Sequence, residues 1–310
     1  NGFAMTLPPV IIAIGLSRSF GTVNAVNKLD LAINRGELYG LVGPDGAGKT
    51  TTMRLLAGIM EPTAGDALVA GFSIRSDPEG VKGHIGYMSQ RFGLYEDLTV
   101  LENILFYADL YEVSKGERSD RIKRLLSFSG LGPFQKRLAG ALSGGMKQKL
   151  GLACALVHTP EVLLLDEPTN GVDPVSRRDF WRILYDLLRE GVTIFLSTSY
   201  LDEAERCTRI GLIHRGSIIL EGEPLQVRSS LNVPMIELWP DRVREAGARA
   251  RETAGVKDVT VYGDRLHIAL EQGAAAASVI ESLLRSGIAV LDHRAILPSL
   301  EDVFIAMVEK

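Results

Sequence analysis

Short apolar runs alternate with helical patterns along most of the chain. A run at 37–42 ends in Gly43, and a helical pattern over 49–57 stops at Gly58, where glycine suits the left-handed end of a helix. Further strands are predicted at 67–72, 85–88, 162–165, 192–196, 210–214 and 217–220. Strands that alternate with helices in this way are typical of a largely parallel α/β sheet.

The pattern changes twice along the chain. Between 90 and 160 one helical pattern follows another with no convincing strand, which predicts a helical insertion, and one of its helices opens with a capping box of Thr99 and Glu102. From about residue 233 the order strand, helix, strand, strand, helix, strand begins, which resembles a small ferredoxin-like unit. The fold class is therefore α/β, with a sheet core, a helical insertion and a small C-terminal α+β domain.

The composition is that of an ordinary globular protein. The 310 residues include 34 basic and 38 acidic ones, for a net charge of −4, and 46% are hydrophobic. This balance excludes a disordered or fibrous chain and provides no overall field for nucleic acid. Cys154 and Cys207 are predicted to be reduced thiols in the core, and the apolar runs are shorter than the roughly 18 residues that cross a membrane.

A glycine-rich loop between a predicted strand and a predicted helix has the pattern of a phosphate-binding site. Residues 43–50 fit G-x-x-x-x-G-K-[ST] without adjustment. The glycines let backbone N–H groups converge on phosphate oxygens at a helix N-terminus, where an anion is favoured. Lys49 would reach the β- and γ-phosphates, and the hydroxyl of Thr50 would bind Mg²⁺.

Two adjacent carboxylates follow the predicted strand at 162–165. Asp166 and Glu167 at this place carry a desolvation cost that a metal ion and a water molecule would offset. We assign Asp166 to the Mg²⁺ side and Glu167 to the attacking water, as general base. This pair alone is weak evidence, because an acid at the end of a strand is often only a cap or a turn.

A second helix start of the same kind lies at 142–148. Ser143, Gly144 and Gly145 open a helix whose N-terminus is another anion site. Because the chain already has one phosphate loop, two such helix ends indicate that two chains share each nucleotide. With these three motifs in this order, the chain resembles the nucleotide-binding subunit of an ATP-binding cassette (ABC) transporter over about residues 10–227.

The resemblance implies a role for further residues. It places Gln90 in the Q-loop as a Mg²⁺ ligand, Asp173 in the D-loop at the dimer interface, and Phe20 with Val26 against the adenine. The residues that it assigns to the nucleotide are Phe20, Val26, Gly43, Asp45, Gly46, Ala47, Gly48, Lys49, Thr50, Thr51 and Gln90. Those that it assigns to the metal are Thr50, Gln90 and Asp166, while Ser143, Gly144 and Gly145 form the signature that contacts the ATP of the opposite cassette.

The resemblance also implies the organisation of the whole assembly. Residues 10–230 would form a P-loop cassette with a mixed sheet and a helical subdomain at about 91–160, followed by the small domain at 233–310. Residues 1–9, ahead of the cassette, are expected to be an N-terminal extension or a remnant of cloning. ATP and Mg²⁺ would be bound. The expected partners are a second cassette and an ABC-2 type permease at the cytoplasmic face of the bacterial inner membrane.

The branch of the family is indicated by three stretches. Residues 146–148, 166–174 and 298–304 resemble the multidrug-exporter branch, and in particular the first half of exporters that carry two cassettes in one polypeptide. If so, the chain is a fragment of a longer protein. We expect the small domain to be a stabilising appendage or dimer contact, with ligand sensing as the alternative.

Two positions depart from the family pattern. Ser199 occupies the place of the switch histidine, and Asp45 stands where asparagine is usual in the phosphate loop. A serine hydroxyl stabilises less charge than an imidazolium, so slow hydrolysis is expected. Two alternatives stay open: a regulatory nucleotide clamp that is paired with a complete cassette, and a soluble ABC ATPase of translation or DNA repair. The spacing of the motifs and the single cassette argue against the second alternative.

Overall fold

The computed structural model describes residues 8–90 and 93–308. The chain divides into two compact units, Asn1–Glu221 (unit 1) and Gly222–Lys310 (unit 2), so the division lies before the predicted one at 230–233. Residues 1–7 of the predicted extension at 1–9 lie outside the described residues. Within the described ranges, no helix combines the length and the apolarity that crossing a bilayer requires.

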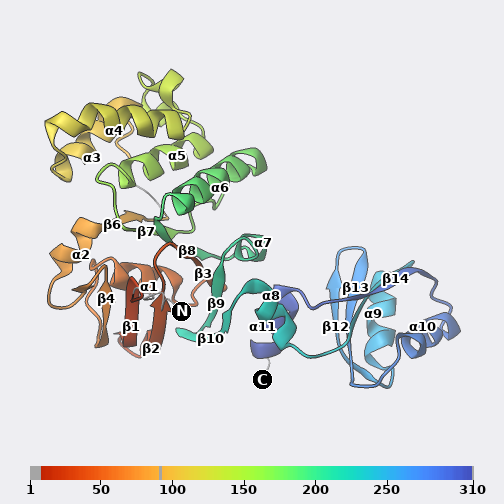
Figure 1. Cartoon of the computed structure of the whole chain (residues 1–310). Helices are drawn as coiled ribbons and strands as arrows, with labels where there is room; N and C mark the ends of the chain where they lie inside the picture. The colour runs from red at the N-terminus through yellow and green to blue at the C-terminus, as the bar shows by residue number, and fades with distance from the viewer. Residues whose placement is uncertain (1–7, 91–92, 309–310) are drawn as a thin grey trace, which may run out of the picture. The chain divides into compact units, whose positions relative to one another are not determined.

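Unit 1 contains two sheets (Figure 1). The larger sheet has the strand order β10-β9-β3-β8-β7-β6, and the smaller one has the order β2-β1-β4-β5. The strands of the larger sheet are β3 (Leu38–Val42), β6 (Ile85–Met88), β7 (Val162–Asp166), β8 (Thr193–Thr198), β9 (Arg209–His214) and β10 (Ser217–Gly222). Those of the smaller sheet are β1 (Ile11–Phe20), β2 (Val23–Ile33), β4 (Ala64–Val69) and β5 (Phe72–Ser73).

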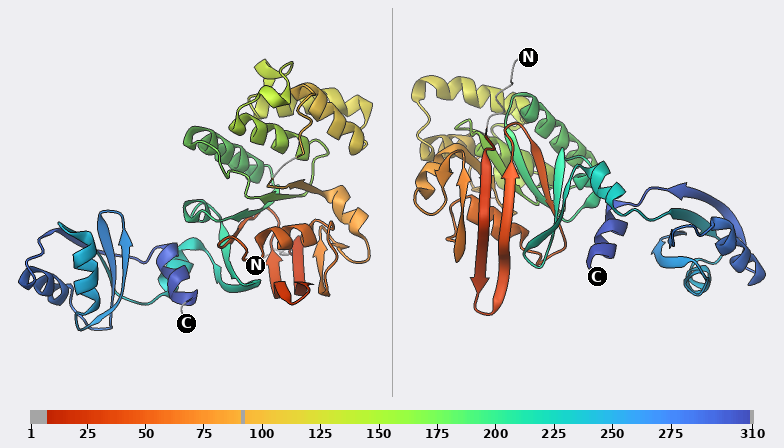
Figure 2. Two further views of the ribbon diagram at one scale, coloured as in Figure 1. Left: turned by 180° about the vertical axis from the view of Figure 1, so that it is seen from behind. Right: turned by 60° about the horizontal axis from the view of Figure 1, so that its bottom comes forward.

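The core of unit 1 lies around α1 (Lys49–Leu56), between the two sheets (Figures 1 and 2). Met53, Leu55 and Leu56 of this helix are fully buried and join apolar residues of both sheets. On the opposite face of the larger sheet lie α5 (Gly144–Ala155) and α6 (Pro174–Arg189). Two short helices complete the sheet region, α2 (Pro78–His84) and α7 (Leu201–Ala204).

The register of the larger sheet places three strand ends side by side. β3 pairs with β8 in parallel so that Val42 lies opposite Thr198, and β7 pairs with β8 so that Asp166 lies opposite Ser197. Because parallel strands end at the same edge of a sheet, the residues that follow them meet there. β8 lies between the other two strands, so Ser199 comes between the phosphate loop and Glu167.

The predicted helical insertion is present. It contains α3 (Val100–Leu110), α4 (Lys115–Phe128) and α5, with two short 3-10 turns at Gly132–Phe134 and Ala139–Ala141. Its described residues include no strand beyond one isolated bridge between Thr99 and Leu138. The capping box of Thr99 and Glu102 forms as predicted, and Cys154 and Cys207 are buried free thiols, which confirms their assignment to the core.

The smaller sheet was not foreseen. The predicted strand at 67–72 is instead the β4–β5 hairpin, because Ala70 and Gly71 take left-handed φ angles of 51° and 90° and reverse the chain. The strand β4 pairs in antiparallel fashion with β1 and lies outside the parallel sheet. The class of the fold is unchanged, and unit 1 has the mixed sheet arrangement that the family resemblance implied.

Unit 2 has the predicted ferredoxin-like order. Its strands form one antiparallel sheet in the order β12-β13-β11-β14, with a core against α9 and α10. The strands are β11 (Met235–Pro240), β12 (Val256–Tyr262), β13 (Arg265–Leu270) and β14 (Val290–Ile296). The helices are α8 (Pro224–Ser230), α9 (Val243–Arg251), α10 (Ala276–Arg285) and α11 (Leu300–Val308).

A charged cluster ties α11 to the sheet of unit 2. Nδ1 of His267 lies 3.2 Å from Oδ2 of Asp302, and its Nε2 lies 3.4 Å from Oε1 of Glu237. Arg265 and Arg294 also pair with Glu237. Burial alone would lower the pKa of His267, but Asp302 and Glu237 outweigh burial and raise the pKa above its ordinary value of 6.5.

This cluster predicts a pH dependence of the stability of unit 2. A raised pKa in the folded state means that protonated His267 contributes stability below about pH 6.5, and that this contribution is lost as the pH rises through the raised value. We therefore expect His267→Gln to lower the free energy of unfolding by about 1 to 3 kcal/mol near pH 5.5 and by clearly less near pH 9. The free energy of unfolding is measured by urea titration and followed by the fluorescence of Trp239, in a Trp181→Phe background that leaves Trp239 as the single tryptophan. The exposed His293→Gln is the matched control, and an equal loss for His267→Gln at both pH values would contradict the prediction.

Candidate functional site

The phosphate loop joins β3 to α1 in a conformation that only its glycines permit. Gly46 and Gly48 have φ angles of 78° and 108°, in the left-handed region. A Cβ atom at Gly43 would overlap the carbonyl oxygen of Ile213, and one at Gly48 would overlap that of Ala25. The loop is therefore held against β9 and β2, and the first turn of α1 is placed behind it.

Lys49 is the centre of the site. Its side chain is 4% exposed, and Nζ donates to the carbonyl oxygens of Gly43 (2.8 Å) and Pro44 (3.0 Å) and to Oγ of Ser199 (2.8 Å). The same Nζ lies 3.0 Å from Oε1 of Glu167. The ammonium group is thus surrounded by oxygen atoms, which offset the cost of its burial.

Glu167 is held in one position by four side chains. Besides Lys49, the hydroxyl of Ser199 donates to Oε1 (3.1 Å), while Gln90 Nε2 (2.9 Å) and Asn170 Nδ2 (3.2 Å) donate to Oε2. The backbone of Glu167 has a left-handed φ of 48°, and its N–H donates to the backbone oxygen of Ser197. A residue other than glycine keeps such a φ only when its surroundings hold it there.

Asp166 offers an unused oxygen atom. Oδ1 accepts hydrogen bonds from Ser197 Oγ (2.6 Å) and Thr50 Oγ1 (3.2 Å), whereas Oδ2 is buried without a hydrogen-bond partner. Burial raises the pKa of Asp166 above its ordinary value of 3.8, although the hydrogen bonds from Ser197 and Thr50 oppose the shift. A buried carboxylate oxygen beside a threonine hydroxyl fits Mg²⁺, which prefers few protein oxygens together with phosphate and water.

No group of three or more His, Cys, Asp or Glu side chains that could hold a metal occurs in the part of the chain that the structure describes. A Mg²⁺ site built from Thr50, Gln90 and Asp166 would not need one, since only one of these ligands is a carboxylate.

A cavity of about 310 Å³ opens in front of these side chains. Several of the predicted site residues line it: Asp45, Gly46, Gly48, Lys49, Thr50, Thr51, Gln90 and Glu167. Ala25 and Asn170, for which no role was predicted, also line it. A place for Asn170 at the cavity could have been predicted, because it lies only three residues after Glu167. No sequence pattern indicates that Ala25 lines the cavity.

Phe20 and Val26, the two predicted adenine contacts, do not line this cavity. Phe20 is 46% exposed at the end of β1, where the guanidinium group of Arg18 lies 4.8 Å from the centre of its ring. Val26 is fully buried in the core of unit 1, so its side chain offers no surface to a base, which corrects the contact expected for it. The side chains of successive residues point to opposite faces of a strand, and it is the neighbouring Ala25 that lines the cavity.

The signature residues and Asp173 lie outside this cavity. Ser143 caps α5 by accepting the N–H of Met146 (3.3 Å), and Ser143 and Gly144 are exposed. Asp173 caps α6 by accepting the N–H groups of Val175 and Ser176, and the hydrogen bonds from Ser176 lower its pKa. The exposed N-terminus of α5 is therefore free to face another molecule.

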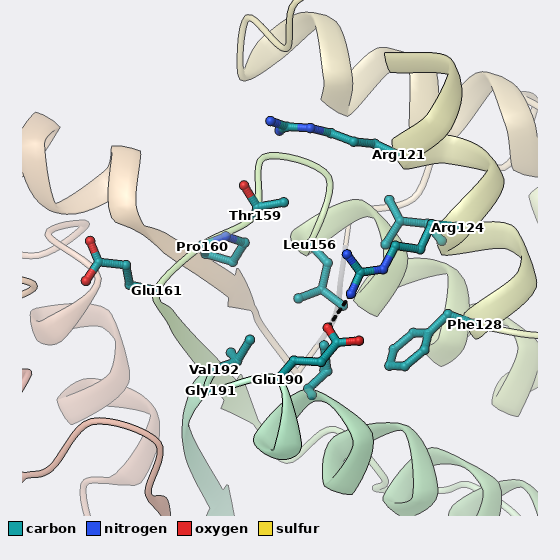
Figure 3. A pocket seen from close by; sticks show the side chains of 12 residues that line it. Arg121, Arg124, Phe128, Leu156, Thr159, Pro160, Glu161, Glu190, Gly191 and Val192 are labelled. Atoms are coloured by element: carbon teal, nitrogen blue, oxygen red, sulfur yellow. Dashed lines mark ion pairs between the residues drawn. The ribbon is translucent and has the colours of Figure 1, made fainter. Parts of the chain in front are cut away.

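A larger cavity of about 380 Å³ lies between α4, the loop before β7 and the end of α6 (Figure 3). Arg124 and Glu190 form an ion pair at 2.5 Å within it. None of the predicted site residues lines it, so we place the functional site at the smaller cavity.

Comparison with known proteins decides the family. A model described as "ABC transporter" matches residues 26–170, and one described as "ATP-binding protein DrrA1-3-like, C-terminal domain" matches residues 222–308. The daunorubicin/doxorubicin resistance ATP-binding protein DrrA of Streptomyces peucetius is 35% identical over 301 residues, which cover 94% of this chain and 90% of DrrA. The chain belongs to the ATP-binding proteins of ABC transporters. This confirms the predicted family and the resemblance to drug-exporter ATPases.

Three further proteins allow the length and the fold of this ABC protein to be compared with those of its relatives. A probable multidrug ABC transporter ATP-binding protein of Escherichia coli is 44% identical over 300 residues, and this chain spans about half of its length (51%). The solved ATP-binding subunit of an ABC transporter superposes with a TM-score of 0.66 at 29% identity, covering 72% of this chain and 93% of that one. A dimeric cassette bound to ADP and Pi superposes with a TM-score of 0.62 at 26% identity, covering 69% and 98%. The predicted cassette fold is confirmed.

The close approach of α5 to α6 predicts that a side chain at position 145 destabilises the fold. A Cβ atom at Gly145 would overlap Cβ and Oγ of Ser176, whereas one at Gly144 would meet open space. We expect Gly145→Ala to lower the free energy of unfolding by about 1 to 3 kcal/mol, measured by urea titration. Gly144→Ala is the matched control and should not destabilise the protein. Adding Ser176→Gly to Gly145→Ala should restore part of the loss; a Gly145→Ala variant as stable as the control would contradict this packing.

Proposed function

We propose that this chain is the ATP-hydrolysing subunit of a membrane exporter. The observation that carries the proposal is the contact between Lys49 Nζ and Glu167 Oε1 at 3.0 Å, because it places a phosphate-binding cation and a general base at one cavity. The relatives support export: one is named for daunorubicin and doxorubicin resistance, and another for bacitracin transport in Bacillus licheniformis.

Binding of ATP would exchange the partners of Lys49. Phosphate oxygens carry more negative charge than the carbonyl oxygens of Gly43 and Pro44, and they would take over the ammonium group of Lys49. Its ion pair with Glu167 would then weaken. The carboxylate of Glu167 is thereby released at the moment when a substrate is present.

The released carboxylate can act on water. Glu167 would orient a water molecule and accept its proton as the water oxygen attacks the γ-phosphorus and the bond to the β-phosphate oxygen breaks, giving ADP and Pi. Gln90 and Asn170, which donate to Oε2 of Glu167, would keep the carboxylate in position. The hydroxyl of Ser199 would donate a hydrogen bond to the γ-phosphate.

Mg²⁺ would be held by Thr50, Gln90 and the free Oδ2 of Asp166. When bound, it would neutralise phosphate charge. The raised pKa of Asp166 reflects a burial cost that such a cation offsets.

Export requires partners, and we propose two. A second cassette, either a copy of this chain or the other half of a longer protein, would place its signature helix on the nucleotide, since Ser143 and Gly144 are exposed and do not line the cavity of their own chain. An ABC-2 type permease at the cytoplasmic face of the inner membrane would carry the cargo. A soluble ABC ATPase of translation or DNA repair is disfavoured by the DrrA-like unit 2.

A regulatory nucleotide clamp is the second candidate. It is favoured by Ser199, whose hydroxyl lies 2.8 Å from Lys49 and carries no charge of its own, and by Asp45, whose carboxylate lies 3.9 Å from Lys49 and would face the phosphates. In that case the site would bind MgATP and leave turnover to a complete cassette.

The test of the proposed function separates binding from hydrolysis. Lys49→Met should weaken MgATP binding by about 10- to 100-fold in calorimetry, because charge-assisted hydrogen bonds are lost. Glu167→Gln should retain binding and lower single-turnover hydrolysis by about 10² to 10⁴. Lys82→Met, which changes a half-exposed lysine of α2 that does not line the cavity, is the control. Equal MgATP affinity in the wild type and Lys49→Met would refute the site.

The role of position 199 has its own prediction. Ser199→His introduces a donor that can carry positive charge, and we expect single-turnover hydrolysis to rise by about tenfold or more. Quenched-flow measurement of ADP formation at saturating MgATP reads the change directly, with Ser229→His, an exposed position of unit 2, as the control. An unchanged rate would argue that Ser199 does not limit hydrolysis.

A further inference from the structure

Glu203 is a buried carboxylate that the proposed mechanism does not use. It lies in α7, four residues after Ser199, and is 1% exposed. A carboxylate buried to this degree is stable only when donors surround it. The donors here come from three separate parts of unit 1, which makes Glu203 a junction between them.

Two of the donors belong to the loops that carry the reacting groups. Thr198 Oγ1 donates to Oε2 of Glu203 at 2.7 Å, and Thr169 Oγ1 donates to Oε1. Thr198 directly precedes Ser199, and Thr169 lies two residues after Glu167. One carboxylate therefore connects the end of β8 to the turn after β7.

The hydrogen bonds continue into the backbone of both loops. Oγ1 of Thr198 also accepts the N–H of Tyr200 at 3.0 Å, so the backbone on both sides of Ser199 is held. In the other loop, the N–H of Asn170 donates to the backbone oxygen of Glu167 at 3.1 Å, which closes a tight turn around Thr169. That turn begins at Glu167, whose left-handed φ of 48° needs support from its surroundings.

The third part is α6. Trp181 Nε1 donates to Oε1 of Glu203 at 3.5 Å, and the charge of Arg177 forms an ion pair with the same oxygen, with Nε at 3.7 Å. The guanidinium group of Arg177 also lies 4.6 Å from the centre of the Tyr200 ring. The packed helix α6 thus anchors the carboxylate, and through it both loops.

We propose that Glu203 is a positioning residue that sets the placement of Glu167 relative to Ser199. The proposal rests on the proposed ATP hydrolysis, since Glu203 contacts none of the atoms that would react. It implies that loss of the carboxylate loosens both loops together and slows hydrolysis, while the phosphate loop still binds nucleotide.

Two variants test this, and one matched control accompanies them. Glu203→Gln keeps the shape but turns one acceptor into a donor, and Thr169→Val removes one donor while Glu203 stays in place. The control is Glu37→Gln, another buried carboxylate, which pairs with Arg209 (2.9 Å) at the beginning of β3, the opposite end of the sheet from the site. It reports the effect of disturbing a buried carboxylate without touching either loop.

The first readout is hydrogen–deuterium exchange of the nucleotide-free full chain. Both test variants should speed exchange in the peptides that cover 167–172 and 198–203, and Glu37→Gln should not. Unchanged exchange in these peptides would overturn the proposal, whether or not the chain hydrolyses ATP.

The second readout is turnover. For Glu203→Gln we expect kcat to fall by about 10- to 100-fold, as for a misplaced reacting group, with the Kd for MgATP changed by less than about threefold. An equal fall of kcat and affinity, or an unchanged kcat despite faster exchange, would also overturn it. If the wild type hydrolyses no faster than Glu167→Gln, the proposed function itself fails, and the exchange result alone then decides whether Glu203 holds the loops.

Discussion

The buried ammonium group of Lys49 is the interaction on which the site depends. It lies where the residues after β3, β7 and β8 meet, and it contacts oxygen atoms from each of them. These oxygens stabilise the ammonium group, because a buried cation must have partners. The glycines of the loop, the parallel register and the position of Glu167 all serve to bring these oxygens to one point.

This arrangement joins binding to chemistry. The carboxylate that would act on water is the counter-ion of the cation that would bind phosphate, so binding of the substrate would release Glu167. Ser199 lies between the two, within hydrogen-bond distance of both, and contributes no charge. If the proposed function holds, hydrolysis would depend strongly on how firmly the two loops that carry Glu167 and Ser199 are held.

The sequence predicted most of the residues at the site, because the motifs are local. The residues needed to bind phosphate, Lys49 and Thr50, directly follow a glycine loop. The two carboxylates, Asp166 and Glu167, directly follow an apolar run. The ferredoxin-like order of unit 2 was likewise readable from alternating strands and helices. The smaller sheet was missed. Residues 67–72 were predicted as one straight strand, whereas left-handed φ angles at Ala70 and Gly71 reverse the chain there and form the β4–β5 hairpin.

By itself, then, the sequence determined the family, the phosphate loop and the pair of carboxylates. Only the tertiary structure decided which side chains meet: that Ala25 and not Val26 lines the cavity, that Asn170 and Gln90 both hold Glu167, and that Glu203 joins two loops. The physical reason is that these contacts depend on the pairing of strands far apart in the chain. Residues 42, 166 and 198 become neighbours through sheet register, which no local pattern encodes.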